Sequence, residues 1–409
     1  MTIRHYLHAA TLAAAGICHS ASASEQLTVA VTNTGALARP AETIVIAWAS
    51  VNQYLPGALL QQIAVKDAAG KLLAYQVTNV APQAKDPRGV GAAYGELIFQ
   101  HDFAAGEKAA SFTVEKTTTV SAPFPSRVFA RYVPERLDDF AWENDKLAHR
   151  TYGPALGAPA AAGSGKEVLV ASGIDIWFKR VPYPIVDRWY NKGHDHYHHD
   201  QGEGIDMYNV GATRGNGGTG IWDGRQLYVG ANYVAWKVIA NGPVRAIFEL
   251  SYDAWDAAGV KVSEVKRFTV DAGHYFDQVD STFTFAGPQQ LTVAVGVNKA
   301  PADKGQEPKV RFTRAAGDTA LIQWVEQRSN GAFGTAVILP AAQKDGFAED
   351  ARNALILAPV GAGKPLRYYV GAAWTRAGEF RSEQDWQRYV AAQAARVRTP
   401  VTVSLAGAR

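Results

Sequence analysis

Apolar and polar residues alternate along much of the chain, most clearly in its middle third. From Val244 to Tyr252 the apolar side chains occupy every second position, with only Ile247 out of step. Residues 279–285 alternate in the same way, and residues 261–270 do so less regularly. A period of two is typical of β-strands, and Gly-, Pro- and Asp-rich turns separate these runs. The pattern therefore predicts an antiparallel meander of three strands.

The N-terminal part shows the same signature in shorter runs. Because turn residues separate these runs, we predict a small β-sandwich, or the first sheet of a larger one, over about residues 25–120. The predicted strands cover residues 27–32, 43–49, 61–66, 72–77, 95–101 and 111–114. We expect residues 24–409 to form a single β-supersandwich domain, in which residues 24–120 could be a distinct N-terminal layer.

One helix is predicted near the end of the chain. Ser382 suits the N-cap position, and Asp385 three residues later completes a capping pattern. Apolar residues follow at helical spacing until Pro400, after which residues 401–405 could return as a last strand. The predicted fold class is thus mainly β, a large antiparallel β-sandwich with few helices.

The first 23 residues are typical of a secretory signal peptide. Arg4 precedes a short apolar stretch, and Ala21-Ser22-Ala23 offers the small residues that a signal peptidase accepts. From this signal peptide we expect a periplasmic or extracellular protein. The alternative is that the segment forms a buried N-terminal helix. The single cysteine, Cys18, would be removed with the signal peptide.

Composition narrows the class of protein. The 409 residues are 47% hydrophobic and 11% aromatic, which excludes disorder for most of the chain. The 41 basic and 38 acidic side chains nearly balance, so no strong positive field favours nucleic acid. No segment is long and apolar enough to predict a membrane-spanning helix. The H-E-x-x-H motif of common metalloproteases is absent, and so is the G-x-S-x-G motif that surrounds the nucleophile of many serine hydrolases.

Four histidines lie within six residues, at His194, His196, His198 and His199, and acidic and aromatic residues surround them. Glycines in the same segment predict a loop or a strand edge. Three interpretations remain open: acid–base catalysis by a histidine, a divalent metal such as zinc or calcium, or a solvated polar loop. The candidate metal ligands are His194, His196, Asp200 and Asp206. Alternate residues such as His194, His196 and His198 would share one face of a strand.

A second polar cluster spans residues 131–145 and mixes acids, arginines and amides with aromatic residues. Aromatic rings can stack on sugars, and polar side chains can bind the hydroxyl groups. The candidates for substrate binding are Asp139, Trp142, Glu143, Asn144 and, from the first cluster, Glu203. The alternative is a surface network of salt bridges around two core aromatic residues. A third segment, residues 215–220, is glycine-rich but lacks the context of a nucleotide site, although Arg214 beside it could reach an anionic substrate.

Two of these segments resemble a known family. RYVPERLDDFAWENDKLAHRTY (131–152) and YHHDQGEGIDMYNVGATRGNGG (197–218) are similar to two blocks of the DUF4861 family of secreted bacterial proteins. Residues 368–386 carry a third similarity. The resemblance implies a fold like the galactose-mutarotase β-supersandwich. It also implies an association with the degradation of acidic plant or algal polysaccharides.

These observations lead to a hypothesis of β-elimination on a uronate-containing oligosaccharide or polysaccharide, by a lyase or a dehydratase. Such a reaction needs a cation for the carboxylate, a base for the C5 proton and an acid for the leaving oxygen. The candidates are Arg136 or Arg214, His198 or His199, and Tyr208 or Tyr197, respectively. Asp200, Glu203 and Asp206 would orient the imidazoles or hold a metal. A glycoside hydrolase with paired carboxylates such as Glu143 and Glu203, or a non-catalytic glycan-binding or mutarotase-like accessory protein, is the alternative.

The one-site hypothesis expects residues 194–206, Arg136 and Glu143 to converge in one pocket. The sequence does not indicate the sugar or the oligomeric state.

Overall fold

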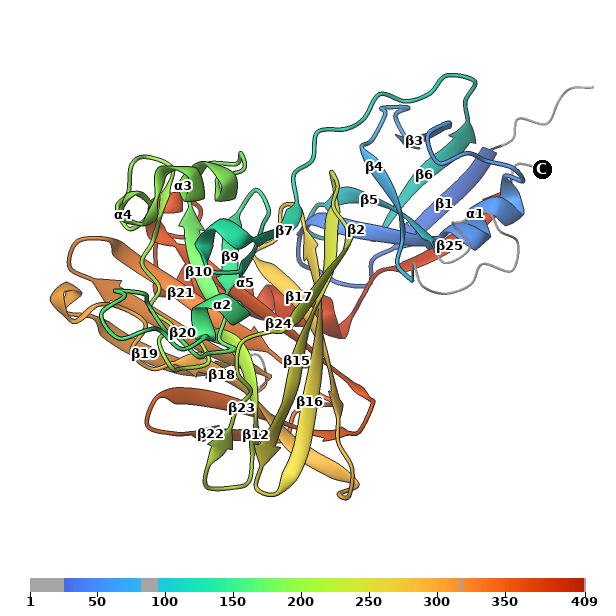
Figure 1. Cartoon of the computed structure of the whole chain (residues 1–409). Coiled ribbons are helices and arrows are strands. Elements are labelled where there is room, and N and C mark those ends of the chain that lie inside the picture. The colour runs from blue at the N-terminus through green and yellow to red at the C-terminus, as the bar shows by residue number, and fades with distance from the viewer. Residues whose placement is uncertain (1–25, 82–94, 316, 318, 408–409) are drawn as a thin grey trace, which may run out of the picture.

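The computed structural model of the chain describes residues 26–81, 95–315, 317 and 319–407 (Figure 1). The predicted signal peptide, residues 1–23, lies outside the described residues. In the described part, the strands build five antiparallel sheets, and the fold is mainly β, as the alternation predicts.

Two sheets pack face to face as the main sandwich. The predicted meander is confirmed, because β15, β16 and β17 pair in order as neighbouring antiparallel strands. The larger sheet has eight strands: β14 (Ala235–Ala240), β15 (Arg245–Ala257), β16 (Val260–Asp271), β17 (Phe276–Thr284), β24 (Pro365–Trp374), β21 (Gly331–Ile338), β20 (Ala320–Gln327) and β19 (Lys309–Ala315). The smaller sheet has five: β13 (Leu227–Tyr228), β12 (Asn216–Trp222), β18 (Gln290–Asn298), β23 (Asn353–Gly361) and β22 (Phe347–Glu349).

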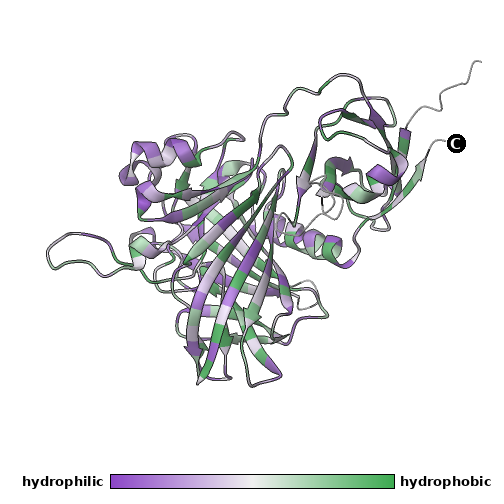
Figure 2. Ribbon diagram, turned by 45° about the vertical axis from the view of Figure 1, so that its right-hand side comes forward, coloured by the Kyte–Doolittle hydropathy of each residue, from purple (hydrophilic) through white to green (hydrophobic). Residues whose placement is uncertain are grey.

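The core of this sandwich comes from alternate residues of the long strands. Phe248 and Phe268 stack with ring centroids 4.7 Å apart, and both are fully buried with Val279 and Val295. Hydrophilic and hydrophobic residues alternate along these strands (Figure 2). Burying one face of each strand supplies most of the driving force for packing the two sheets together.

A third sheet lies beside the main sandwich and has both faces covered. Its order is β11 (Gly204–Asp206), β10 (Asp175–Lys179), β9 (Leu147–Thr151), β8 (Asp139–Glu143) and β7 (Phe129–Val133). Helices α3 (Val186–Lys192) and α4 (His194–Tyr197) pack on one face through Trp177, Trp189 and Tyr197. Every residue of β8, β9 and β10 is buried, so the charged residues in these strands must find partners inside the protein.

The N-terminal segment forms a smaller sandwich with its own core. One sheet orders β25 (Thr402–Gly407), β1 (Gln26–Thr32), β6 (Ala109–Lys116) and β3 (Ile63–Asp67). The other orders β2 (Arg39–Ala47), β5 (Gly95–Phe103) and β4 (Tyr75–Asn79). The last strand of the chain therefore completes a sheet begun by the first strand (Figure 1).

One helix in the N-terminal sandwich was not predicted. The sequence predicted a strand from residue 43 to residue 49, but the strand ends at Ala47 and α1 (Trp48–Tyr54) begins. Trp48 and Val51 of this helix are buried in the core of the small sandwich. Their burial stabilises a helix whose own sequence carries no capping side chain.

The predicted C-terminal helix is confirmed as α5 (Glu383–Arg398), with the Ser382 hydroxyl accepting a hydrogen bond from the backbone N–H of Asp385 at 3.2 Å. Its Trp386 ring packs closely on Gly334, where a Cβ atom would lie 2.3 Å from the indole. The remaining short helices are α2 (Pro154–Gly157), η1 (Pro134–Arg136), η2 (Lys304–Gln306) and η3 (Thr375–Ala377). Within the described ranges, no helix has the length and apolar character needed to span a membrane.

Candidate active site

The histidine-rich segment folds differently from the prediction. The sequence predicted a loop or strand edge with His194, His196 and His198 on one face, but residues 194–197 form the helical turn α4. Residues four apart share a face of a helical turn, so His194 and His198 meet, with their Nε2 atoms 3.2 Å apart. His196 lies two residues from each and therefore points elsewhere.

The His198 ring is held in one tautomer by the backbone. Its Nδ1 atom lies 3.0 Å from the carbonyl oxygen of Asp206 in β11. A carbonyl oxygen can only accept, so Nδ1 carries the hydrogen, and Nε2 of the neutral ring has a free electron pair. Partial burial lowers the pKa of His198, an effect that the carbonyl of Asp206 opposes and the neighbouring His194 and Arg150 strengthen. Near pH 7 the ring is therefore neutral and suited to accept a proton.

Behind this ring lies a buried arginine surrounded by carboxylates. Arg150 of β9 donates from Nε to Asp175 at 2.8 Å and from Nη2 to Asp206 at 2.9 Å, and Nη1 lies 3.6 Å from Asp139. The guanidinium also lies 5.4 Å from the ring centroid of Trp177 and 5.5 Å from that of Tyr197. We call Arg150, Asp139, Asp175 and Asp206 the charge cluster. It joins β8, β9, β10 and β11.

The carboxylates of the charge cluster do not all ionise easily. Burial raises the pKa of Asp139 to about 6. Burial also raises the pKa of Asp175, and burial together with the neighbouring Asp175 raises that of Asp206 well above its usual range. Burial alone would lower the pKa of Arg150, but Asp206 and Asp175 raise it well above the ordinary value. The arginine is therefore always charged, and burial opposes the ionisation of the carboxylates that pair with it.

A pocket of about 280 Å³ opens in front of His198 and the charge cluster. Its walls come from η1, β9, β10, the segment before β10 and the segment after β11. The charged and imidazole side chains that line it are Arg136, Arg150, Glu167, Asp175, His194, His198, Asp206 and Asp303. Two buried tyrosines, Tyr152 and Tyr208, line it as well.

Arg136 is the cation of the pocket that a ligand can reach. Its Nη2 atom donates to Oε2 of Glu167 at 2.7 Å. The Glu167 side chain is 54% exposed, whereas that of Arg136 is 15% exposed. The carboxylate thus reaches in from the surface toward a cation fixed in the wall. Tyr197 is buried beneath the pocket, with its hydroxyl 3.4 Å from Nη1 of Arg150, and does not line the pocket.

Four of the residues predicted to bind substrate lie in the interior instead, and one of them, Asp139, belongs to the charge cluster. Trp142 is fully buried and donates from Nε1 to Asp277 at 2.8 Å, so neither face of its ring is open to a sugar. Glu143 binds Lys179 at 2.7 Å and accepts from the backbone N–H groups of Ile185 and Val186 where α3 begins. Asn144 shapes a turn, because its Oδ1 accepts from two backbone N–H groups nearby. Glu143 does not line the pocket with His198, contrary to the expected convergence.

Other predicted residues also lie outside the pocket. Arg214 is buried elsewhere, where Nη1 donates to Ser172 at 2.7 Å, and burial lowers its pKa to about 10. Glu203 accepts from Arg188, Tyr183 and Trp189, which fastens α3 to the segment before β11. His199 is exposed to solvent one residue after His198.

The predicted metal ligands do not come together. Asp200 pairs with Arg180 at 3.0 Å, the carboxylate of Asp206 binds Arg150, and His196 is on another side of the turn. Across the part of the chain that the structure describes, no group of three or more His, Cys, Asp or Glu side chains is arranged to hold a metal ion. The predicted ligands His194, His196, Asp200 and Asp206 therefore do not fit zinc or calcium.

Three residues of the site were missed from the sequence: Arg150, Tyr152 and Asp175. Arg150 and Tyr152 fall inside the segment 131–152 that resembles a family block, and they were not singled out there. A signal was present, because an arginine within a strand buried on both faces requires buried acidic partners. Asp175 opens β10 without any local motif, and only the pairing of β9 with β10 brings it to Arg150.

Comparison with known proteins gives a family match, a curated relative and several similar solved structures. The family model described as "Domain of unknown function (DUF4861)" matches residues 31–403. A curated relative, "Uncharacterized protein P7" of Formosa agariphila, is 29% identical over 391 residues, which cover 93% of this chain and 94% of the relative.

Similar solved structures include a glycosyl hydrolase family 38 protein from Enterococcus faecalis, with 9% identity and a TM-score of 0.48. An alpha-mannosidase from Enterococcus faecalis V583 has 10% identity and a TM-score of 0.45. Each match covers 94% of this chain, and this chain covers 48% and 46% of those chains, respectively. The chain therefore spans about half the length of these solved structures.

We predict that Arg150→Met destabilises the protein by about 3–5 kcal/mol, because it leaves buried carboxylates without their cation. Denaturant unfolding followed by tryptophan fluorescence measures the difference. Arg328→Met is the matched control, since the Arg328–Glu307 pair is exposed and should contribute less than about 1 kcal/mol. Equal small losses for both variants would contradict the assigned role of Arg150.

Proposed function

This chain belongs to the DUF4861 family, and from the chemistry of its pocket we propose that it is a carbohydrate-active enzyme that acts on uronate-containing oligosaccharides by β-elimination. In this proposal, His198 is the base, Arg136 binds the uronate carboxylate and Tyr208 is the acid. Loss of a sugar from C4 would make the enzyme a lyase, and loss of water would make it a dehydratase.

The observation that carries the proposal is the grouping of these three side chains around one pocket. β-Elimination needs a cation, a base and an acid at the same sugar ring, because the proton on C5 and the group on C4 leave neighbouring atoms. Arg136 comes from η1, His198 from the end of α4 and Tyr208 from the segment after β11. The geometry thus supplies one group for each role.

The cation makes the proton removable. A proton next to an ionised carboxylate is a very weak acid, since its removal places further negative charge on the carboxylate. Arg136 is largely buried and keeps its charge because Asp139 raises its pKa despite the cost of burial. A uronate carboxylate bound to Arg136 would have its charge neutralised, which stabilises the negative charge that develops when C5 loses its proton.

The base is His198 through its Nε2 atom. In the structure this atom faces Nε2 of His194 at 3.2 Å, and the His194 side chain is 55% exposed, so a substrate can displace it. The hydrogen on Nδ1 stays with the carbonyl oxygen of Asp206, which holds the ring in place during the transfer. After transfer the imidazolium lies near Asp206 and Asp175, whose carboxylates can stabilise its charge.

Tyr208 completes the step as the acid. Burial raises the pKa of its phenol, so the hydroxyl holds its proton throughout the neutral range. The electron pair of the C5–H bond becomes the C4–C5 double bond, the C4–O bond breaks, and the leaving oxygen takes the proton of Tyr208. His198 has then gained a proton and Tyr208 has lost one, so before the next turnover His198 releases a proton to solvent and Tyr208 takes one up.

The alternative hydrolase is less well supported by the site. Its predicted carboxylate pair, Glu143 and Glu203, is engaged in interactions that fasten α3, and neither residue lines the pocket. A purely binding protein would need no proton acceptor held in one tautomer beside an ion-pairing arginine. Release of reducing sugar without an unsaturated product would favour hydrolysis over elimination.

We predict that His198→Ala lowers turnover of uronate oligosaccharides by about 10²–10⁴-fold, the usual contribution of a positioned base. The assay follows the unsaturated uronate by its absorbance near roughly 235 nm, which the double bond formed by proton removal produces. His199→Ala is the matched control, because it removes the adjacent, exposed imidazole and should leave turnover unchanged. Equal effects of the two substitutions, or no chromophore with any uronate substrate, would contradict the proposal.

We also predict the acidic side of the pH profile. Since burial lowers the pKa of His198, its neutral form persists below the ordinary value of about 6.5 and is lost only as the pH falls through the lowered pKa. The acidic limb of kcat/KM should therefore have its midpoint below about 6.5. Asp139, whose pKa is raised to about 6, titrates nearby, so NMR titration of the His198 ring must give the same midpoint. A midpoint above the ordinary value would contradict His198 as the base.

Glu167 is predicted to compete with the substrate for Arg136. The Glu167→Gln substitution removes the competing negative charge, so KM for a uronate oligosaccharide should fall about 3- to 10-fold, an ion-pair effect of about 1 kcal/mol, with little change in kcat. Initial-rate kinetics measure both constants. Asp303→Asn is the control, because Asp303 lines the same pocket without pairing with Arg136. An unchanged or raised KM for Glu167→Gln would show that the substrate carboxylate does not bind Arg136.

A further inference from the structure

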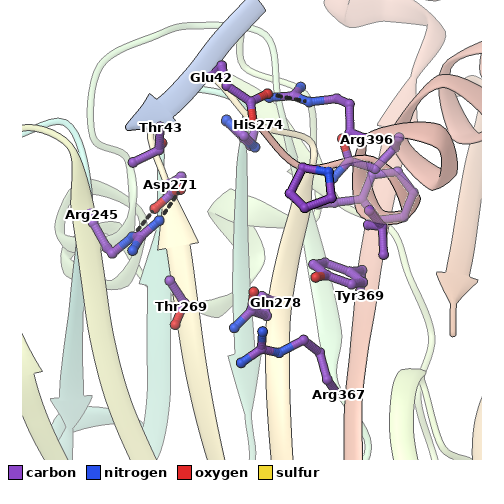
Figure 3. Close-up of a pocket in the computed structure, with 14 residues that line it drawn as sticks. Glu42, Thr43, Arg245, Thr269, Asp271, His274, Gln278, Arg367, Tyr369 and Arg396 are labelled. Carbon is purple, nitrogen blue, oxygen red and sulfur yellow. Dashed lines mark hydrogen bonds and ion pairs between the residues drawn. The ribbon is translucent and has the colours of Figure 1, made fainter. Parts of the chain in front are cut away.

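A second pocket lies between the small N-terminal sandwich, the outer face of the main sheet and the end of α5 (Figure 3). Its volume is about 290 Å³, and it shares no lining residue with the candidate active site. Strand β2, strands β15, β16, β17 and β24, and α5 all contribute to its walls. Its principal polar groups are Arg245, Asp271, Gln278, Arg367, Tyr369 and Arg396.

The arginines of this pocket are already neutralised. Arg245 holds Asp271 with two hydrogen bonds of 2.6 and 2.7 Å, and Arg396 binds Glu42 through Nε at 2.9 Å (Figure 3). Both partners of each pair are less than 15% exposed. An anion that displaced either acid would leave a largely buried carboxylate without its cation, which is unfavourable.

The third arginine of the pocket, Arg367, is also neutralised by an acidic partner. Arg367 is paired with Asp280 through Nε at 2.7 Å and Nη2 at 3.1 Å, and Gln278 also donates to Asp280 at 2.8 Å. Burial lowers the pKa of His274, and the positive charge of the nearby Arg396 lowers it further. The His274 ring therefore adds no charge near pH 7. The three arginines and their three acids therefore leave no net charge around the pocket.

We propose that this pocket is a second carbohydrate site, which binds an uncharged sugar unit of a glycan. A paired guanidinium keeps N–H groups that point away from its carboxylate, and the carboxylate keeps free lone pairs. Side by side, such donors and acceptors match neighbouring hydroxyl groups, each of which both donates and accepts. Gln278, Thr43 and Thr269 add groups of the same kind, and the Tyr369 ring supplies an apolar wall for a sugar ring.

The two pockets would thus bind different units of the same glycan. The candidate active site presents Arg136, whose exposed partner Glu167 can be displaced by a carboxylate. The second pocket has no such cation, because the arginines in its walls are held by largely buried acids. A mixed polysaccharide contains charged and uncharged units, and we infer that the second pocket holds an uncharged unit. This inference does not depend on the reaction in the first pocket.

Binding to the full-length His198→Ala protein tests the second site. The probes are cellotetraose, xylotetraose, mannotetraose and maltotetraose, with inorganic sulfate as a charged competitor. Saturation-transfer NMR detects binding, and calorimetry gives the Kd. We expect at least one neutral probe to bind, sulfate not to compete, and Gln278→Ala to raise the Kd at least tenfold.

Thr282→Ala is the matched control, since Thr282 lies on the same face of β17 four residues further on and outside the pocket. It should leave the Kd unchanged. If Gln278→Ala lowers the unfolding midpoint, Arg367→Gln replaces it, because Arg367 is half exposed. Absence of binding by all four probes, binding that neither substitution weakens, or competition by sulfate would overturn the proposal.

Discussion

The ion pairing of Arg150 inside a sheet buried on both faces is the interaction on which the site depends. A guanidinium at this depth loses its water, and Asp175, Asp206 and the rings of Trp177 and Tyr197 replace that solvation. Since its partners come from different strands, the arginine also fixes how β9, β10 and β11 lie relative to one another. The Asp206 backbone that holds His198 is positioned in this way.

The same cluster gives the pocket the electrostatic properties that the proposed base needs. Burial raises the pKa values of the three carboxylates close to Arg150, and repulsion from Asp175 adds to the effect for Asp139 and Asp206. His198 lies at the edge of this group, where partial burial favours its neutral form and nearby carboxylates can stabilise its protonated form. A base needs both properties, because it must be free of its proton at first and must tolerate the proton afterwards. In the proposed function, the stability of the site and its reactivity would therefore depend on the same charged groups.

The sequence predicted the fold where the signals are local. The alternation in β15 and β17 and the capping pattern at Ser382 are read from neighbouring residues, and the structure confirms the meander and the helix. The site was harder to predict, because it forms through pairing between distant strands. His198, Arg136 and Tyr208 were named from composition and resemblance, and the structure places them around one pocket. Their assigned roles remain predictions.

The errors also have physical reasons. Trp142 and Glu143 have the residue types of a sugar site, but residues on a strand covered on both faces cannot reach solvent. Arg214 precedes a glycine-rich segment and was expected to reach an anionic substrate, but the segment forms strand β12 and Arg214 is buried. Residue type shows which chemistry is possible, whereas exposure, which depends on the packing of distant sheets, determines which residues can carry it out.

The most direct measurement is the rate of chromophore formation from a uronate oligosaccharide that carries deuterium at C5. If His198 removes this proton in the slow step, the deuterated substrate should react slower by a factor of about 2 or more, and solvent should gain the deuterium. Breakdown of both substrates at equal rates, to products that keep deuterium at C5 and show no chromophore, would contradict the account.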